Sequence, residues 1–126
     1  MKAKDLPKNY IEITLSMLDT KWKPLIIKEL LTGTKRFGEL KISVGKITQK
    51  VLTSNLRSME DSGLLQRIEY KQMPPKVEYT LTDIGYSLAV VLDSMEQWGS
   101  AYKEFLKLTE KQNKKLKNLP NKTSEK

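Results

Sequence analysis

The chain has 126 residues, of which 38% are hydrophobic and 30% are charged, and its formal net charge at pH 7 is +8. This length suits a single domain with its own hydrophobic core. The chain contains neither Cys nor His, which excludes disulfides, thiolate metal sites, thiol switches and catalysis by the commonest general base. No apolar run approaches membrane length and no signal peptide is recognisable, so we expect a cytoplasmic protein with no metal and no cofactor.

The positive charge is concentrated in two parts of the chain. Residues 107–126 hold seven Lys against two Glu, and residues 35–57 hold six basic residues against Glu39 alone. A concentrated basic region favours a polyanionic partner, most often nucleic acid, whereas a solvated charged face is the alternative. For the C-terminal tail, residues 109–126, we favour a role in solubility over contact with the DNA backbone.

The N-terminal third predicts two helices after a polar arm, residues 1–9. Apolar residues recur at helical spacing over residues 10–18, which predicts the first helix. Asp19 or Thr20 can cap the second helix, which tolerates Pro24 in its first turn and ends at Gly33. Its expected apolar face consists of Leu25, Ile26, Leu30 and Leu31.

A tight helix–turn–helix is predicted next. Residues 34–36 suit an edge strand or a turn, and residues 37–44 suit a short helix with Phe37, Leu40 and Val44 inward. Thr48 is a typical N-cap for a helix over residues 49–62, and Gly63 is its stop. The apolar stripe of this helix consists of Leu52, Leu56 and Met59.

Two strands and a long helix complete the pattern. The segments LLQRIEYK and KVEYTL alternate as strands do, and we assign Ile68, Tyr70 and Tyr79 to the core. The connecting QMPP loop is stiffened by two prolines and should project beyond the sheet. Thr82 should cap a long final helix, which Gly99 could bend, before the tail begins after residue 108.

This order of elements is that of a winged helix-turn-helix, an α+β fold that is mainly α, with extra N- and C-terminal helices. An α-helix fits the major groove of DNA, and residues near its N-terminus reach base edges. The polar side of the helix over residues 49–62 has the residue types that such reading needs, while Glu60 and Asp61 lie in its last turn. The candidate reading residues are Thr48, Gln49, Lys50, Thr53, Ser54 and Arg57.

Four segments closely resemble the HxlR-type bacterial transcriptional regulators, which are relatives of the MarR winged-helix proteins. They are DTKWKPLIIKELLTGTKRFGEL, ITQKVLTSNLRSMEDSGLLQR, YKQMPPKVEYTLTDIGYSL and MEQWG, in this order within residues 9–100. The resemblance implies a homodimeric DNA-binding regulator over residues 10–108, with the terminal helices at the dimer interface. Many members carry a redox-sensing Cys just before the first helix, near Asn9 here, and that mechanism cannot carry over. The GGKW-like turn also differs, since it reads DTKW in this chain.

Further candidate contacts flank the reading helix. Lys35 and Arg36 suit either a phosphate contact or a solvated turn, and Lys71, Gln72 and Lys76 suit a wing that contacts DNA or a charged edge that prevents aggregation. Trp22 and Trp98 are assigned to the core or an interface. The apolar seam of the final helix repeats at steps of three and four, which favours a partner helix. The predicted dimer interface consists of Ile11, Leu15, Leu88, Val91, Met95, Trp98, Tyr102 and Phe105.

The leading hypothesis is a sequence-specific transcription regulator that binds a pseudo-palindromic operator as a homodimer. The alternative is a winged-helix protein-interaction module that does not bind DNA. An enzyme is disfavoured because His, Cys and a nucleotide-binding Gly motif are missing. A small apolar effector, bound near Trp22, Trp98 or Tyr102, is a further hypothesis for regulation.

Overall fold

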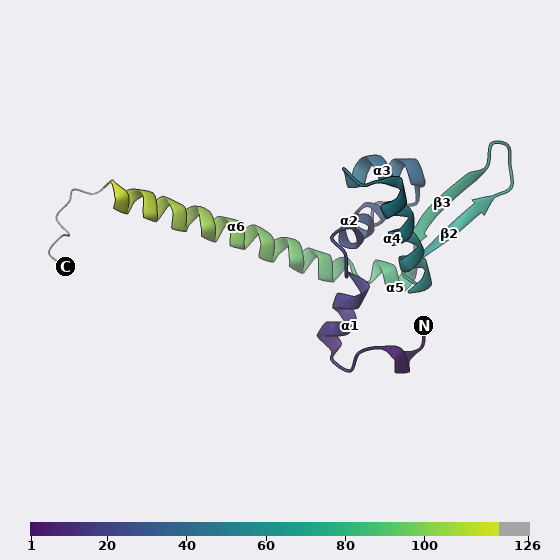
Figure 1. Ribbon diagram of the computed structural model, residues 1–126, viewed down its shortest axis with the longest axis horizontal. Coiled ribbons are helices and arrows are strands. Elements are labelled where there is room, and N and C mark those ends of the chain that lie inside the picture. The colour runs from purple at the N-terminus through teal and green to yellow at the C-terminus, as the bar shows by residue number, and fades with distance from the viewer. Residues whose placement is uncertain (119–126) are drawn as a thin grey trace. The chain divides into compact units, whose positions relative to one another are not determined.

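The computed structural model describes residues 1–118, which form helices with one small sheet (Figure 1). A 3-10 turn (Ala3–Asp5) precedes helices α1 (Tyr10–Met17) and α2 (Trp22–Leu30). Strand β1 (Lys35–Arg36), helices α3 (Phe37–Val44) and α4 (Gln49–Asp61), strands β2 (Leu65–Tyr70) and β3 (Lys76–Leu81), and helices α5 (Asp83–Tyr86) and α6 (Ala89–Lys117) follow. Met1–Leu92 form one compact unit, and a second unit begins at Asp93 within α6.

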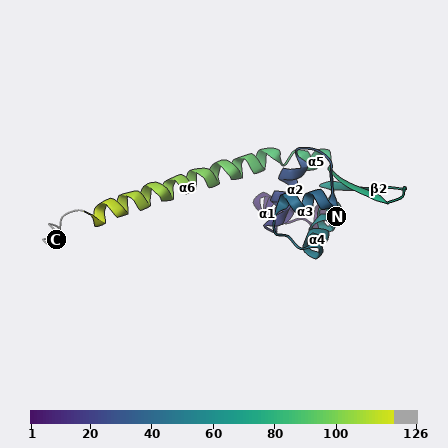
Figure 2. The same cartoon turned by 90° about the horizontal axis from the view of Figure 1, so that it is seen from above.

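The sheet is antiparallel and has the strand order β1-β3-β2. Leu65 lies opposite Leu81 at the base of the hairpin, and Tyr70 lies opposite Lys76 at its far end. Residues 35–36 pair with β3, so this segment is an edge strand and not a turn. Both views show the β2–β3 hairpin extending beyond helices α2, α3 and α4, which confirms a projecting wing (Figures 1 and 2).

The hydrophobic core joins α2, α3 and α4 to the base of the sheet. Its buried side chains are Ile26, Ile27, Leu30, Leu40, Val44, Ile47, Leu52, Leu56, Met59, Leu64, Leu65, Leu81 and Leu92. The prediction for α2 was wrong at Leu25, which is 43% exposed, whereas Ile27 is fully buried. The helical period explains the error, because residues 23, 26, 27 and 30 form one stripe and residue 25 lies to its side. Ile68 is only half-buried.

Local signals fix both ends of α4. The Thr48 side chain accepts a hydrogen bond from the Val51 amide at 3.1 Å, which confirms the predicted N-cap. Gly63 adopts a positive φ of 80°, and the Leu64 amide donates to the Met59 carbonyl at 2.9 Å. A left-handed glycine followed by an amide that donates to a carbonyl five residues earlier is a common helix stop. Helix α4 therefore ends where the sequence predicts.

The C-terminal region differs from the single long helix that was predicted. Thr82 does act as a cap, but the helix it caps is α5, and α6 restarts at Ala89. Gly85 packs against the Leu64 backbone so closely that a Cβ there would overlap the Leu64 carbonyl oxygen. Leu88 then packs against the core. Tertiary packing of this short segment therefore overrides its continuous helical pattern.

Helix α6 continues through Gly99 without interruption and reaches Lys117, nine residues beyond the boundary expected at residue 108. Residues 109–117 lack Gly and Pro and are rich in Lys, Glu and Gln, which favour helix. The rest of the expected tail, residues 119–126, lies outside the described residues. Within residues 1–118, no helix is long and apolar enough to cross a membrane.

Candidate nucleic-acid interface

The polar side of α4 lines an open hollow with a volume of about 870 Å³, here called the α4 hollow. Five of the six predicted reading residues line it together, all from the helix itself: Gln49, Lys50, Thr53, Ser54 and Arg57. All five side chains are exposed. The sixth, Thr48, is also exposed but is engaged as the helix cap. The structure therefore brings the predicted reading residues onto one accessible surface.

Four further residues line the same hollow and were not predicted. They are Met1, Ser58, Asp61 and Ser62. Helical spacing could have identified Ser58 and Asp61, since each lies four positions after a predicted reading residue. Asp61 brings one negative charge to the C-terminal end of the hollow, away from the reading end. Nothing in the sequence pattern signals that Met1 returns to this helix.

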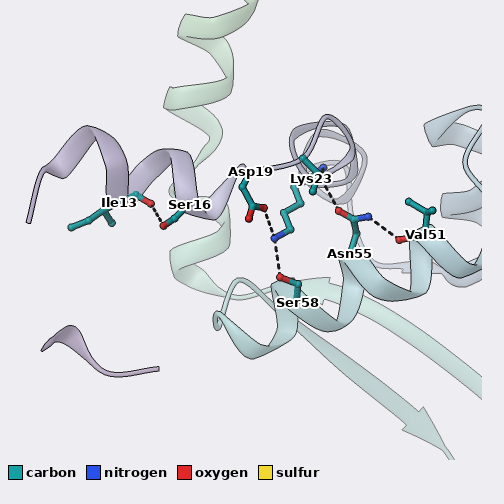
Figure 3. Close-up of polar contacts among 8 residues, drawn as sticks. Ile13, Ser16, Asp19, Lys23, Val51, Asn55 and Ser58 are labelled. Atoms are coloured by element: carbon teal, nitrogen blue, oxygen red, sulfur yellow. Dashed lines mark hydrogen bonds and ion pairs between the residues drawn. The ribbon is translucent and has the colours of Figure 1, made fainter. Parts of the chain in front are cut away.

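A set of polar contacts, here called the anchoring network, connects α4 to the α1–α2 turn through Asn55, which is buried, and Ser58, which also borders the α4 hollow. Lys23 is 5% exposed, and its Nζ lies 2.8 Å from Asp19 Oδ1. The same Nζ donates to Ser58 Oγ at 2.8 Å (Figure 3). A single buried ammonium thus joins the start of α2 to the C-terminal half of α4.

Thr20 and Asn55 make a second connection of the same kind. Thr20 Oγ1 donates to Asn55 Oδ1 at 2.6 Å and accepts from the Lys23 amide at 3.2 Å. Asn55 is 6% exposed, and its Nδ2 donates to the Val51 carbonyl at 2.8 Å (Figure 3). Asp19 or Thr20 was predicted to cap α2, but the N-cap position is Lys21. Thr20 still accepts from an amide in the first turn of α2, and it also fixes a buried amide on α4.

The anchoring network supports α4, the helix that carries the predicted reading residues. Buried polar groups are tolerated only when they are hydrogen-bonded, and a fully satisfied set specifies one arrangement of the helices that carry it. Among the described residues, no buried side-chain nitrogen or oxygen lacks a hydrogen-bond partner. The α1–α2 turn consequently helps to fix the orientation of α4, together with the buried Leu52, Leu56 and Met59.

The wing presents charged side chains on both strands. Lys71 and Gln72 are exposed in its loop. Lys76 is half-buried, with Nζ 3.5 Å from Glu78 Oε2 and 4.8 Å from the centre of the Tyr70 ring. Of the three predicted wing contacts, Lys71 and Gln72 are thus the accessible ones, while Lys76 already has partners within the hairpin.

Tyr70 was predicted to be a core residue, and this was wrong, because its side chain is 38% exposed. It lies near the wing tip, beyond the helices that cover the base of the sheet. Its hydroxyl donates to Glu78 Oε1 at 3.0 Å, and this hydrogen bond, together with the negative charge of the carboxylate, raises the pKa of the phenol. Tyr79, by contrast, packs partly against the core.

The basic pair on β1 lies at the free edge of the sheet. Lys35 Nζ donates to Thr32 Oγ1 at 2.9 Å, and Arg36 is exposed. The Arg36 amide donates to Glu39 Oε1 at 2.7 Å, which helps to begin α3. Within residues 1–118, no group of three or more carboxylates is placed to hold a metal ion.

The residues of the predicted dimer interface fall in both units of the chain. In the first unit, Ile11 and Leu15 are exposed on α1, Val91 is half-buried, and Leu88 packs against the core. In the second unit, Met95, Trp98, Tyr102 and Phe105 are exposed along α6. The rings of Trp98 and Tyr102 stack with centroids 5.2 Å apart, and those of Tyr102 and Phe105 are 6.0 Å apart. These aromatic side chains form a continuous apolar ridge on α6.

Comparison with known proteins agrees with this architecture. Residues 17–107 match the HxlR-like helix-turn-helix family. The HTH-type transcriptional regulator YdeP of Bacillus subtilis is 45% identical over 94 residues, which cover 75% of this chain and 73% of YdeP. The regulator YkvN of the same organism is 46% identical over 93 residues, covering 74% of this chain and 79% of YkvN.

Solved structures with a similar fold include two regulators in their reduced forms. The redox regulator HypR is 37% identical, with a TM-score of 0.74 over 79% of this chain and 98% of HypR. The transcriptional regulator YodB from B. subtilis is 35% identical, with a TM-score of 0.64 over 78% of this chain and 90% of YodB. The chain therefore belongs to the HxlR-like helix-turn-helix family, a family of winged helix-turn-helix proteins whose named relatives are transcriptional regulators.

Proposed function

We propose that this protein is a sequence-specific, DNA-binding transcription regulator that acts in the cytoplasm as a homodimer on a pseudo-palindromic operator. The α4 hollow is the observation that carries the proposal. It gathers five candidate reading side chains on an exposed helix, which is held from behind by the anchoring network. A helix presented in this way can enter the major groove without rearrangement.

The chemistry of the α4 hollow suits base edges. Gln49 can bond to adenine with its side-chain amide, whose oxygen accepts and whose nitrogen donates. Lys50 can donate to guanine or to a phosphate, and Thr53 can offer its methyl group to thymine. Ser54 and Arg57, farther along the helix, suit phosphate or base contacts. The N-terminal end of α4 also carries the positive end of the helix dipole, which favours a nearby phosphate.

The wing and the β1 edge would supply contacts that position the protein on the duplex. Lys71 and Gln72 are exposed in the wing loop, and Arg36 is exposed on β1. We expect all three to contact sugar or phosphate groups, which fix orientation without carrying sequence information. Lys76 and Lys35 contribute less, because each is half-buried and already bonded within the protein.

Homodimerisation is supported by exposed apolar side chains on both terminal helices. Trp98 is 69% exposed and Ile11 is 71% exposed, and such large apolar surfaces commonly mark a protein interface. A two-fold axis would place two α4 helices about 34–36 Å apart, so that they face successive major grooves. The operator would then share the two-fold symmetry of the protein.

The signal that controls this protein is not a thiol switch. HypR is named a redox regulator, whereas this chain has no Cys. Asn9, near the position of the sensing Cys in many relatives, instead caps α1 by accepting hydrogen bonds from the amides of Ile11 and Glu12 at 2.8 and 3.3 Å. Asn9 thus has a structural role at this position. Because the chain has no Cys, we expect DNA binding to be insensitive to thiol oxidants.

The dependence of DNA binding on salt concentration tests the proposal. Binding of the purified protein to a mixed-sequence duplex should weaken steeply between low and moderate salt, because each phosphate contact releases counterions. A flat response, or no binding at low salt, would contradict DNA binding and favour a protein-interaction module. Analytical ultracentrifugation of the same sample would test the dimer, and a monomer at all concentrations would contradict that part of the proposal.

A further inference from the structure

The N-terminal arm, residues 1–8, is basic and accessible. Lys2, Lys4 and Lys8 are all exposed, and Asp5 is the only acidic residue of residues 1–8. None of the three lysines belongs to α4 or the wing. The arm therefore adds positive charge in a part of the fold that the contacts proposed so far do not use.

The arm follows a defined course along the protein. The Asp5 amide donates to the Lys2 carbonyl at 2.9 Å, and the Leu6 amide donates to the Ala3 carbonyl at 3.2 Å. Leu6 and Pro7 are half-buried, and Asn9 then caps α1. The segment is thus turned once, partly buried at its base and fixed at the helix that follows it.

This course brings Met1 back to helix α4. Met1 lines the α4 hollow together with Lys50, Ser54 and Arg57. Figures 1 and 2 show the N-terminus beside α4 in both views. Met1, and with it the beginning of the arm, consequently lies at the border of the surface that would face DNA.

We propose that the arm is a second DNA-contacting element, in which Lys2 and Lys4 bind backbone phosphates beside the groove that α4 enters. This inference rests on the proposed DNA-binding function. A groove is bordered by phosphates on both sides, and the major groove is about 12 Å wide. Met1 already lines the α4 hollow, so the arm need not unfold for Lys2 and Lys4 to reach a bordering strand.

Phosphate suits these lysines better than base edges do. A Lys ammonium is a compact, strongly hydrated charge on a flexible stem, and it binds phosphate as a point charge. Contacts of this kind add affinity that depends on salt and leave sequence preference unchanged. The arm should therefore strengthen binding to every duplex by a similar factor.

Paired charge removals test this proposal. The variant Lys2→Gln, Lys4→Gln removes two charges from the arm, and the control Lys111→Gln, Lys114→Gln removes two from exposed positions of α6. Each protein would be titrated with the same mixed-sequence duplex over a range of salt concentrations. Each lost phosphate contact lowers the slope of log K against log salt by about 0.9, so the arm variant should lose up to about 1.8 per subunit. The α6 control should keep the wild-type slope.

The outcomes separate this proposal from the function on which it rests. If the wild-type protein shows no salt-dependent duplex binding, the DNA-binding function itself fails. If the wild type binds and the arm variant has the same slope, the arm proposal alone is overturned. An equal loss of slope in the α6 control also overturns the arm proposal, because the effect would then come from net charge alone. Tighter binding by the arm variant overturns it too, because the arm would then compete with DNA. Circular dichroism would establish that all variants remain folded.

Discussion

Replacing Asp19 by Ala should destabilise this protein more than replacing its buried partner Lys23 by Met. The Lys23 side chain is 6% exposed, and its ammonium has Asp19 and Ser58 as partners at 2.8 Å each. The Asp19→Ala change would leave that ammonium buried with one hydroxyl as a partner. The Lys23→Met change would remove the charge but keep the apolar stem in place.

The burial of the two partners sets the size of the effect. Asp19 is 57% exposed, so it can return to water when Lys23 is removed. We expect Lys23→Met to cost less than about 1 kcal/mol, as the loss of a solvent-exposed pair does. Asp19→Ala should cost about 1–3 kcal/mol, the penalty for an under-satisfied buried group, which is below the roughly 3–5 kcal/mol of a fully buried pair.

A double-mutant cycle isolates this coupling. Asp19 also lies at the N-terminal end of α2, where its interaction with the helix dipole contributes about 0.3–1 kcal/mol. That contribution is lost in both backgrounds and cancels in the cycle. The double variant should therefore be more stable than Asp19→Ala alone.

Urea denaturation followed by tryptophan fluorescence would measure the four free energies of unfolding. All four proteins must be compared at one concentration, because dimerisation makes stability depend on concentration. The buried ion pair is refuted if Asp19→Ala costs no more than Lys23→Met. It is also refuted if the double variant is no more stable than Asp19→Ala, because the Lys23 ammonium would then be solvated.

Three further predictions follow from other parts of the structure. Asp61→Asn should tighten duplex binding roughly threefold per subunit. A negative charge about 7 Å from a phosphate costs about 0.6 kcal/mol in water, and the change removes that repulsion. Glu60→Gln lies in the same turn but outside the α4 hollow, so it should have a smaller effect in the same titration. Gly85→Ala should lower the free energy of unfolding by at least about 2 kcal/mol, because the added methyl group overlaps a backbone carbonyl. Glu78→Gln should lower the pKa of Tyr70 towards its ordinary value, measured by phenolate absorbance.

Each of these predictions has a control or a contrary result. Equal gains from the Asp61 and Glu60 variants would mean that the α4 hollow does not face DNA. Gly99→Ala, in open space on α6, should leave stability unchanged or raise it by up to about 1 kcal/mol, and destabilisation equal to that of Gly85→Ala would contradict the packing argument.

The Tyr70 prediction has a definite sign for stability. Folding raises the pKa of the phenol above the value in the unfolded chain, so the neutral form is favoured in the folded state. The resulting stabilisation is present below the unfolded pKa of about 10. It is lost as the pH rises through the folded pKa. An unchanged absorbance titration in the Glu78→Gln variant, read against a Tyr70→Phe blank, would contradict the assigned hydrogen bond.

Local chemistry made the helix-turn-helix predictable from the sequence. The bounds of α3 agree with prediction. Those of α4 agree to within one residue because the cap at Thr48 and the stop at Gly63 act through neighbouring residues. The apolar stripe of α4 is fully predicted for the same reason, since Leu52, Leu56 and Met59 recur at the helical period. Each of these signals lies within a single element.

The features that escaped prediction depend on contacts between elements. The bonds of Thr20 to Asn55 and of Lys23 to Ser58 each join residues that are 35 positions apart, and no periodicity reports such a pair. The end of the wing extends past the helices, so alternation alone wrongly placed Tyr70 in the core. The break between α5 and α6 likewise depends on packing of Gly85 against the Leu64 backbone and of Leu88 against the core. The supporting surface behind α4 is thus a property of the fold and not of its local sequence.

We propose that the polar side of α4 reads DNA sequence. The most direct measurement compares the wild type with the Gln49→Ala, Lys50→Ala variant, using an operator selected by the wild type and a scrambled duplex at one salt concentration. Each good base contact contributes about 1–3 kcal/mol of discrimination, so the variant should lose at least about tenfold in its ratio of operator to scrambled binding. An unchanged ratio, in a variant that still folds and binds DNA, would contradict the assignment of α4 as the reading helix.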